Sequence, residues 1–256
     1  MKISKNKNFY IWEGIFDIFK KANKFKLGPG FNGKKWKIEQ SKIFKICKDC
    51  SINKKKIPKI YKERNLGLLF VIKKILNKKK NIKILDYGGG FGIAYYILKE
   101  NFEKNIKFIS YSILEIPSFC KFAKKLNSNV SFVSRFNQQR KYDLLYSSSA
   151  LQYVTNWKKT IIKFAKTNSD FILLSDTFVG DIPSYISLQN YYGSKIPHWF
   201  INFKEFNEIF MNNGYKLVSK KKTIATRLGN KKILPMQNFK KKYRLTNTFN
   251  LLYEKK

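Results

Sequence analysis

The chain has 256 residues, of which 43% are hydrophobic and 16% are aromatic. This length suits one large domain or one domain with an added segment, and this composition excludes a disordered chain. Lys and Arg number 53 against 16 Asp and Glu, which gives a formal net charge of +37. Such an excess indicates an anionic partner, either nucleic acid or an acidic membrane.

Lysine accounts for most of this charge. The arginines are Arg64, Arg135, Arg140, Arg227 and Arg244. Arginine is the residue whose planar fork binds phosphate through two bonds. Lysine, isoleucine and asparagine share AT-rich codons, so genome composition is a second source of the bias. We therefore expect much of the charge to be compositional. Nucleic-acid binding and weak association with an anionic membrane stay open, and neither is favoured.

The cysteines and the chain start indicate a cytoplasmic protein. Three cysteines (Cys47, Cys50 and Cys120) are too few for a disulfide framework. The lone histidine, His198, lies far from the Cys47–Cys50 pair, so no metal site is predicted. The first residues form no secretory signal, and no uncharged apolar run is long enough to span a membrane.

The first 80 residues predict helices. Apolar residues recur at helical spacing over 38–50 and over 66–76, after a turn at Gly28-Pro29-Gly30. We expect residues 1–80 to form a helical N-terminal extension or lid. Residues 81–256 would then form the main domain.

From residue 81, short apolar strands alternate with helices. The predicted strands cover 82–86, 108–114, 130–133, 143–147, 171–176, 215–219 and 250–254. The predicted helices cover 93–99, 116–126, 157–166 and 203–212, with Gly214 just beyond the last one. This alternation predicts an α/β fold with a mostly parallel sheet and helices on both faces. Residues 178–203 are expected to form a long aromatic loop.

A glycine-rich turn follows the first of these strands. Asp86, Gly88, Gly89, Gly90 and Gly92 give the pattern acidic-x-G-G-G-x-G between a strand and a helix. The dinucleotide fingerprint G-x-G-x-x-G fails, because its third position falls on Ile93. A phosphate-binding G-K-[ST] loop is absent. The pattern resembles motif I of the class I S-adenosylmethionine (SAM) dependent methyltransferases, whose glycines make room for the methionine part of SAM.

Residues at the next strand ends agree with this resemblance. Glu115 follows the second strand, where an acidic side chain can accept both ribose hydroxyls; it could equally cap the next helix. Ser147 and Ser148 end the fourth strand, which in the family lies beneath the cofactor. The resemblance implies a Rossmann-like, seven-stranded fold with SAM as cofactor.

Further segments narrow the resemblance. They are Trp12-Glu-Gly-Ile, Leu114-Glu-Ile-Pro117, Ser148-Ser-Ala-Leu-Gln-Tyr153, Asp176-Thr and Pro197-His-Trp-Phe. Together they are similar to a family of bacterial methyltransferases associated with surface polysaccharide synthesis. This similarity implies methylation of a small-molecule or glycan acceptor on an oxygen atom. An RNA or DNA methyltransferase and a non-catalytic SAM-binding protein are the alternatives.

Candidate acceptor-side residues follow the fifth strand. Asp176 and His198 are candidate general bases for a hydroxyl acceptor. The aromatic side chains expected to line the acceptor pocket are Trp12, Tyr185, Tyr192 and Trp199. The competing interpretation is structural: a capping aspartate, a buried histidine and aromatic rings in the core.

Overall fold

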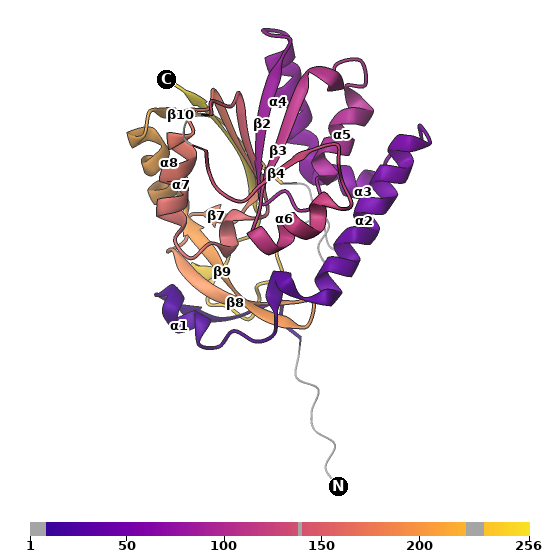
Figure 1. Cartoon of the computed structure of the whole chain (residues 1–256). Coiled ribbons are helices and arrows are strands. Elements are labelled where there is room, and N and C mark those ends of the chain that lie inside the picture. Colours follow the sequence, from indigo (N-terminus) through magenta and orange to yellow (C-terminus); the bar gives the residue numbers. More distant parts are fainter. Residues whose placement is uncertain (1–8, 138–139, 224–232) are drawn as a thin grey trace.

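The computed structural model describes residues 9–137, 140–223 and 233–256, and its centre is a seven-stranded sheet (Figure 1). The strand order is β10-β11-β6-β5-β2-β3-β4. The strands are β2 (Ile82–Tyr87), β3 (Ile109–Leu114), β4 (Ser131–Val133), β5 (Leu144–Ser148), β6 (Phe171–Thr177), β10 (Tyr215–Lys222) and β11 (Phe249–Lys255). Strands β4, β3, β2, β5 and β6 pair in parallel, while β11 is antiparallel to β6 and β10. The predicted α/β fold with a mostly parallel seven-stranded sheet is confirmed.

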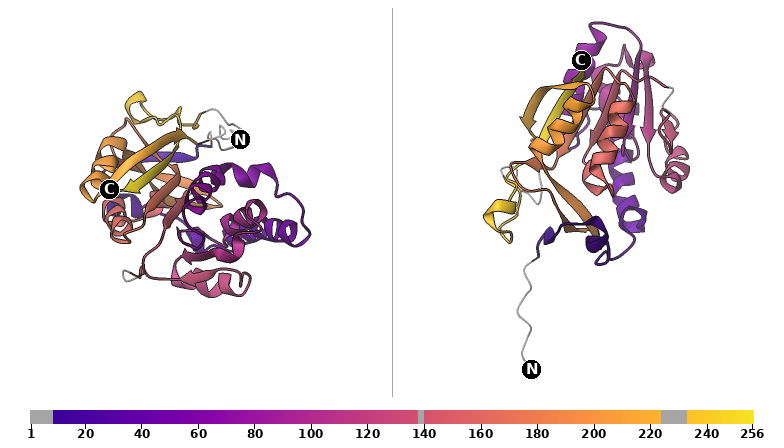
Figure 2. Two further views of the ribbon diagram at one scale, coloured as in Figure 1. Left: turned by 90° about the horizontal axis from the view of Figure 1, so that it is seen from above. Right: turned by 90° about the vertical axis from the view of Figure 1, so that its left-hand side faces the viewer.

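Helices cover both faces of this sheet. Seen from above, α7 and α8 lie on one side and the N-terminal helices on the other (Figure 2). The first group is α7 (Trp157–Lys166) and α8 (Phe203–Asn212); the second is α2 (Lys34–Ile52), α4 (Leu66–Leu76), α5 (Ile93–Asn101) and α6 (Pro117–Lys124). Successive residues of a strand point to opposite faces of the sheet. Ile84 therefore packs in the core with α2 and α4, and Leu85 packs in the core with α7 and α8. Gly214, with φ of +83°, follows α8 as predicted.

A second, four-stranded sheet replaces the expected loop. Its order is β1-β8-β9-β7, and we call it the cap sheet. The strands are β1 (Trp12–Phe16), β7 (Val179–Gly180), β8 (Tyr185–Tyr191) and β9 (Ser194–Asn202). The prediction of a loop over 178–203 was therefore wrong. Tyr192 and Gly193 both have positive φ (+48° and +78°), as the twist of a two-residue hairpin requires.

The N-terminal region is not wholly helical, contrary to the sequence-based expectation. Strand β1 pairs with β8, with Trp12 opposite Gln189 and Phe16 opposite Ile186. Short helical turns complete the region and the connections: α1 (Phe19–Asn23), η1 (Gly30–Asn32), α3 (Lys59–Lys62), η2 (Glu63–Asn65), η3 (Ile106–Phe108), η4 (Leu151–Tyr153) and η5 (Lys241–Tyr243).

The N-terminal helices pack directly on the main sheet. Phe44 and Cys47 of α2 and Leu68 of α4 belong to the same buried cluster as Ile84. A domain boundary at residue 80 stays a prediction, with segments on either side of it sharing this core. Within the described residues, no helix is both long and apolar enough to cross a membrane.

Candidate functional site

The strand order reverses between β2 and β5. From β2 the chain first extends the sheet through β3 and β4, and then returns to β5 on the opposite side of β2. In open α/β sheets, ligands bind outside the carboxyl ends of the strands at such a switch point. The carboxyl ends here carry Asp86 on β2, Glu115 after β3 and Ser148 on β5. The topology therefore brings together the residues predicted for the cofactor.

The glycine turn connects β2 to α5 at this edge. Gly88, Gly90 and Gly92 have φ of +70°, +56° and +84°, and Gly92 is the N-cap of α5. A side chain at Gly88 would collide with the Cβ of Ala150. At Gly90 the position of a Cβ has no heavy atom of the described residues within 4 Å. The backbone at Gly90 is therefore open to a ligand.

Asp86 lies buried beneath this turn. Its Oδ2 accepts a hydrogen bond from the Tyr111 hydroxyl at 2.7 Å, and a side chain at Gly89 would collide with its carboxylate. Within the described residues its Oδ1 has no hydrogen-bond partner. Burial raises the pKa of Asp86 to about 7, with a smaller contribution from the Glu115 charge. A buried carboxylate with one unsatisfied oxygen suits a cationic ligand.

Glu115 faces the same turn from β3. Its Oε1 accepts from the Gly90 amide and its Oε2 from the Ile116 amide, both at 3.1 Å. Burial raises the pKa of Glu115, and these two amide bonds oppose the rise. Two carboxylates from neighbouring strands thus lie around the open backbone of Gly90.

The serines predicted to lie beneath the cofactor differ in their surroundings. Ser147 is buried and donates to the Tyr87 carbonyl at 3.0 Å, so it joins β5 to β2. Ser148, at the end of β5, is only partly buried. Contact with a cofactor stays a prediction for both, and exposure favours Ser148.

Asp176 ends up in a network of polar side chains at the carboxyl end of β6. Its two oxygens accept from the hydroxyls of Ser149 and Thr248, both at 2.5 Å. The Arg64 Nε lies 3.6 Å from its Oδ2. Ser149 and Asp176 both have positive φ, +54° and +53°, a strained backbone for residues other than glycine. Such strain clusters at functional sites.

Arg64 connects this network to polar groups that the sequence analysis missed. Burial raises the pKa of Tyr153 and of Tyr191, and the Arg64 charge opposes both rises. The Tyr153 hydroxyl donates to Oε1 of Gln189 on the cap sheet at 2.8 Å. The sequence holds only a weak signal for Arg64, because it is one of five arginines in a lysine-rich chain.

His198, a predicted base, lies in a closed aromatic cage. The side chain has 0% exposure, and the rings of Trp12, Phe178, Phe200 and Tyr153 have centroids 4.4–5.6 Å away. Within the described residues, neither ring nitrogen has a hydrogen-bond partner. Burial lowers the pKa of His198 to about 3, which keeps it neutral. The structure therefore argues against His198 as the base, because an acceptor cannot reach it.

The aromatic residues predicted for the acceptor pocket have mostly structural contacts. Trp12 and Tyr185 are 1% and 2% exposed in one core cluster, so the structure contradicts their predicted role. Trp199 stacks on Phe19, and its indole donates to the Val154 carbonyl at 3.0 Å. Tyr192 is exposed at the tip of the β8–β9 hairpin. Acceptor contact stays a prediction for Tyr192 and Trp199.

The closed cage leads to a testable prediction about the titration of His198. We expect its imidazole not to titrate between pH 5 and 8, because burial disfavours the charged form. NMR of the ring protons measures this directly, since the chain has a single histidine. The unfolded chain takes up this proton near pH 6.5, so stability should fall as pH drops below that value. His198→Phe should remove this part of the pH dependence. A midpoint near 6.5 in the folded protein would show that the cage is open to water.

Comparisons with known proteins bear on the fold. No family model and no curated protein matches the chain. Similar solved structures include a SAM-dependent methyltransferase from Clostridium acetobutylicum, with 11% identity, 76% of this chain and 91% of that chain covered, and a TM-score of 0.48. Another is 1,6-didemethyltoxoflavin-N1-methyltransferase from Burkholderia thailandensis, with 10% identity. The match covers 86% of this chain and 87% of that chain, with a TM-score of 0.47. A third is magnesium protoporphyrin IX methyltransferase from Synechocystis, with 13% identity. The match covers 76% of this chain and 83% of that chain, with a TM-score of 0.46. At these identities the likeness does not extend to the substrate.

Proposed function

We propose that the chain is a SAM-dependent methyltransferase that acts on an oxygen of a small-molecule or glycan acceptor. The observation that carries the proposal is the pair of carboxylates, Asp86 and Glu115, around the open turn at Gly90. SAM is cationic at its ammonium and sulfonium groups, and its ribose offers two hydroxyl donors. These are the groups that two carboxylates recognise.

The same pair disfavours a dinucleotide. A pyrophosphate placed on this turn would approach Asp86, which is buried beneath it. Like charges at short range in a poorly solvated site repel strongly. The turn also lacks a small residue at the third fingerprint position, where Ile93 stands.

Each cofactor-side residue has a distinct role in the proposal. Glu115 accepts the ribose hydroxyls, and the charge of Asp86, buried beneath the turn, balances the ammonium charge of SAM. Gly90 leaves room for the ligand, and Ser148 lies beside it at the end of β5. Bound SAM supplies a methyl group on a sulfonium, ready for in-line displacement. The protein's contribution is mainly alignment of the two reactants.

The acceptor side rests on Arg64, Asp176, Tyr153 and Gln189. Their guanidinium, carboxylate, hydroxyl and amide groups offer both donors and acceptors to a hydroxylated molecule. Asp176 is only 2% exposed, so in this proposal it acts as the base through the partly exposed Ser149 hydroxyl, which donates to its Oδ2. A role in surface polysaccharide synthesis is supported by the sequence resemblance.

The first test concerns the ribose. Glu115→Ala should weaken SAM binding at least tenfold, because each lost charge-assisted bond contributes about 1.5–3 kcal/mol. Isothermal calorimetry measures the affinity. Glu103→Ala, an exposed glutamate between α5 and η3, is the matched control and should bind SAM normally. Equal affinity in the two folded variants would rule out the assignment of Glu115.

The second test concerns Asp86. Its pKa of about 7 in the free protein means that SAM competes with a proton for this carboxylate. SAM affinity should therefore fall as pH drops below 7, by up to about tenfold per unit. Asp86→Asn should bind SAM weakly and without this pH dependence. A wild-type affinity that is constant from pH 5.5 to 8 would contradict the role of Asp86.

The third test concerns methyl transfer. Methyl-labelled SAM and a panel of hydroxylated small molecules and glycans should reveal an acceptor. Asp176→Asn should then lower kcat by about 10²- to 10⁴-fold with an unchanged SAM affinity. Asp170→Asn, an exposed aspartate paired with Lys141, serves as the control. SAM binding without transfer to any acceptor would favour the non-catalytic alternative.

A further inference from the structure

One end of the molecule exposes bulky apolar side chains next to one another. Figure 1 shows α1 at the end of the molecule away from α4, beside the cap strands β8 and β9. The exposed residues are Ile15 (42%), Ile18 (52%), Phe25 (57%) and Leu27 (59%). We call these four residues, with the lysines among them, the α1 face. A contiguous apolar patch of this kind marks a protein or membrane interaction site.

The charge on the α1 face has one sign. Exposed lysines stand between the apolar residues at positions 20, 21, 24 and 26. Asp17 is the acidic residue in the same stretch, and it pairs with Lys21 at 2.9 Å. Three lysines of this short stretch therefore have no acidic residue within the stretch to balance them.

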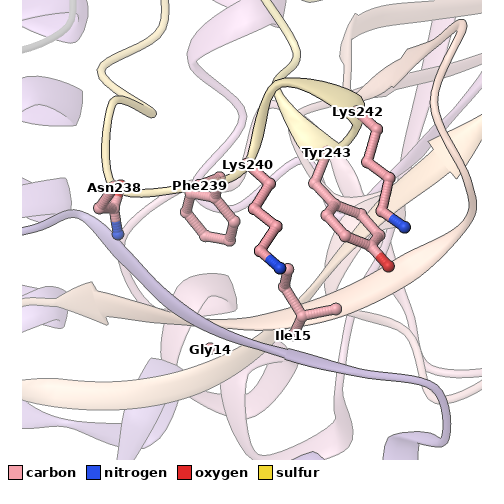
Figure 3. A pocket seen from close by; sticks show the side chains of 7 residues that line it. All are labelled: Gly14, Ile15, Asn238, Phe239, Lys240, Lys242 and Tyr243. Atoms are coloured by element: carbon pink, nitrogen blue, oxygen red, sulfur yellow. The ribbon is translucent and has the colours of Figure 1, made fainter.

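A cavity of about 430 Å³ adjoins the α1 face (Figure 3). It is lined by Gly14, Ile15, Asn238, Phe239, Lys240, Lys242 and Tyr243. In Figure 3 the Lys240 side chain extends towards Ile15. The Phe16 ring, next to Ile15 in β1, lies 5.5 Å from the Phe25 ring on the α1 side of the cap sheet. Phe239 and Tyr243 instead pack against Tyr185 on the other side of that sheet, because successive strand residues point to opposite faces. Lys240 and Lys242 therefore lie across the edge strand β1 from α1, and the cavity is not part of the α1 face.

This combination fits an anionic lipid bilayer. Apolar side chains enter the boundary between headgroups and acyl chains, while lysines around them attract anionic headgroups. A nucleic acid fits less well, because Ile15, Ile18 and Leu27 cannot stack on bases as aromatic side chains do. The nearby Arg244 already donates to the carbonyls of Phe239 and Gln237.

We propose that the α1 face docks the protein on an anionic membrane surface, with its exposed lysines against the headgroup phosphates. The proposal does not depend on methyl transfer. Docking leaves the candidate site accessible, because α1 packs on Ile186 and Leu188 of β8. Gln189, which bonds Tyr153, points to the opposite face of that strand.

Vesicle co-sedimentation tests the proposal. At 0.15 M ionic strength, the protein should bind vesicles that contain phosphatidylglycerol and should not bind pure phosphatidylcholine vesicles. The double variant Phe25→Ser, Leu27→Ser should lower the partition coefficient at least tenfold, because two apolar side chains no longer enter the bilayer. The matched control is Ile52→Ser, Phe70→Ser, which removes two residues that are each 64% exposed on α2 and α4. It should bind as the wild type does.

A second pair of variants keeps the test independent of folding. Lys20→Gln, Lys24→Gln changes only exposed side chains and should also weaken binding to the anionic vesicles. Lys73→Gln, Lys78→Gln, at and beyond the end of α4, should not. Equal loss in both lysine pairs would show that binding follows total charge and would overturn the proposal. Wild-type vesicle binding by Phe25→Ser, Leu27→Ser, together with tighter binding of the protein to RNA, would overturn it in favour of nucleic acid.

Discussion

The candidate site depends on a carboxylate that the fold keeps away from water. Asp86 is 1% exposed at the centre of the parallel sheet, and Tyr111 satisfies only one of its oxygens. Burying such a group costs free energy unless a hydrogen bond or an opposite charge offsets it. Its raised pKa reflects that cost. The glycine turn lies directly above it, so in the proposed function the charge of a cationic cofactor on that turn offsets part of the cost of burying the carboxylate.

The cap sheet is the second constraint, because it joins distant parts of the chain over one edge of the main sheet. Strand β1, near the N-terminus, pairs with β8 in the insertion between β6 and α8. One side of the cap sheet contributes Gln189 to the polar network near Arg64, and the other packs against α1. The aromatic cage around His198 holds these strands together. Its rings therefore build the wall of the site and do not form its chemistry.

The sequence predicted the main sheet well, because its signals are local. Apolar periodicity and turn residues placed α4, α7 and α8 at their observed bounds, and every predicted strand of the central sheet is present. The cap sheet was missed for a physical reason. Strand β8 alternates apolar and polar residues only over the four positions 186–189, and its partner β9 contains Pro197, a residue that argues against a strand. Strand β1 has its partner more than 170 residues away, and no local pattern reports such a pairing.

The cofactor half and the acceptor half of the candidate site also differ in how well the sequence predicted them. Asp86, the glycines and Glu115 follow directly from strand ends in a fixed topology, so a spacing in the sequence was enough to predict that they lie together at one edge of the sheet. The acceptor half is assembled from η2, η4, β6 and β8, whose arrangement only tertiary packing decides. His198 and Trp12 have the residue types of a sugar-binding site, yet their neighbours are aromatic rings. Arg64 lies in the N-terminal region that the sequence assigned to a lid, and its charge reaches tyrosines on both η4 and β8. Arg64 thus brings a positive charge from the covering segment to the polar groups at this sheet edge, so in the proposed function acceptor recognition depends on the position of the N-terminal helices.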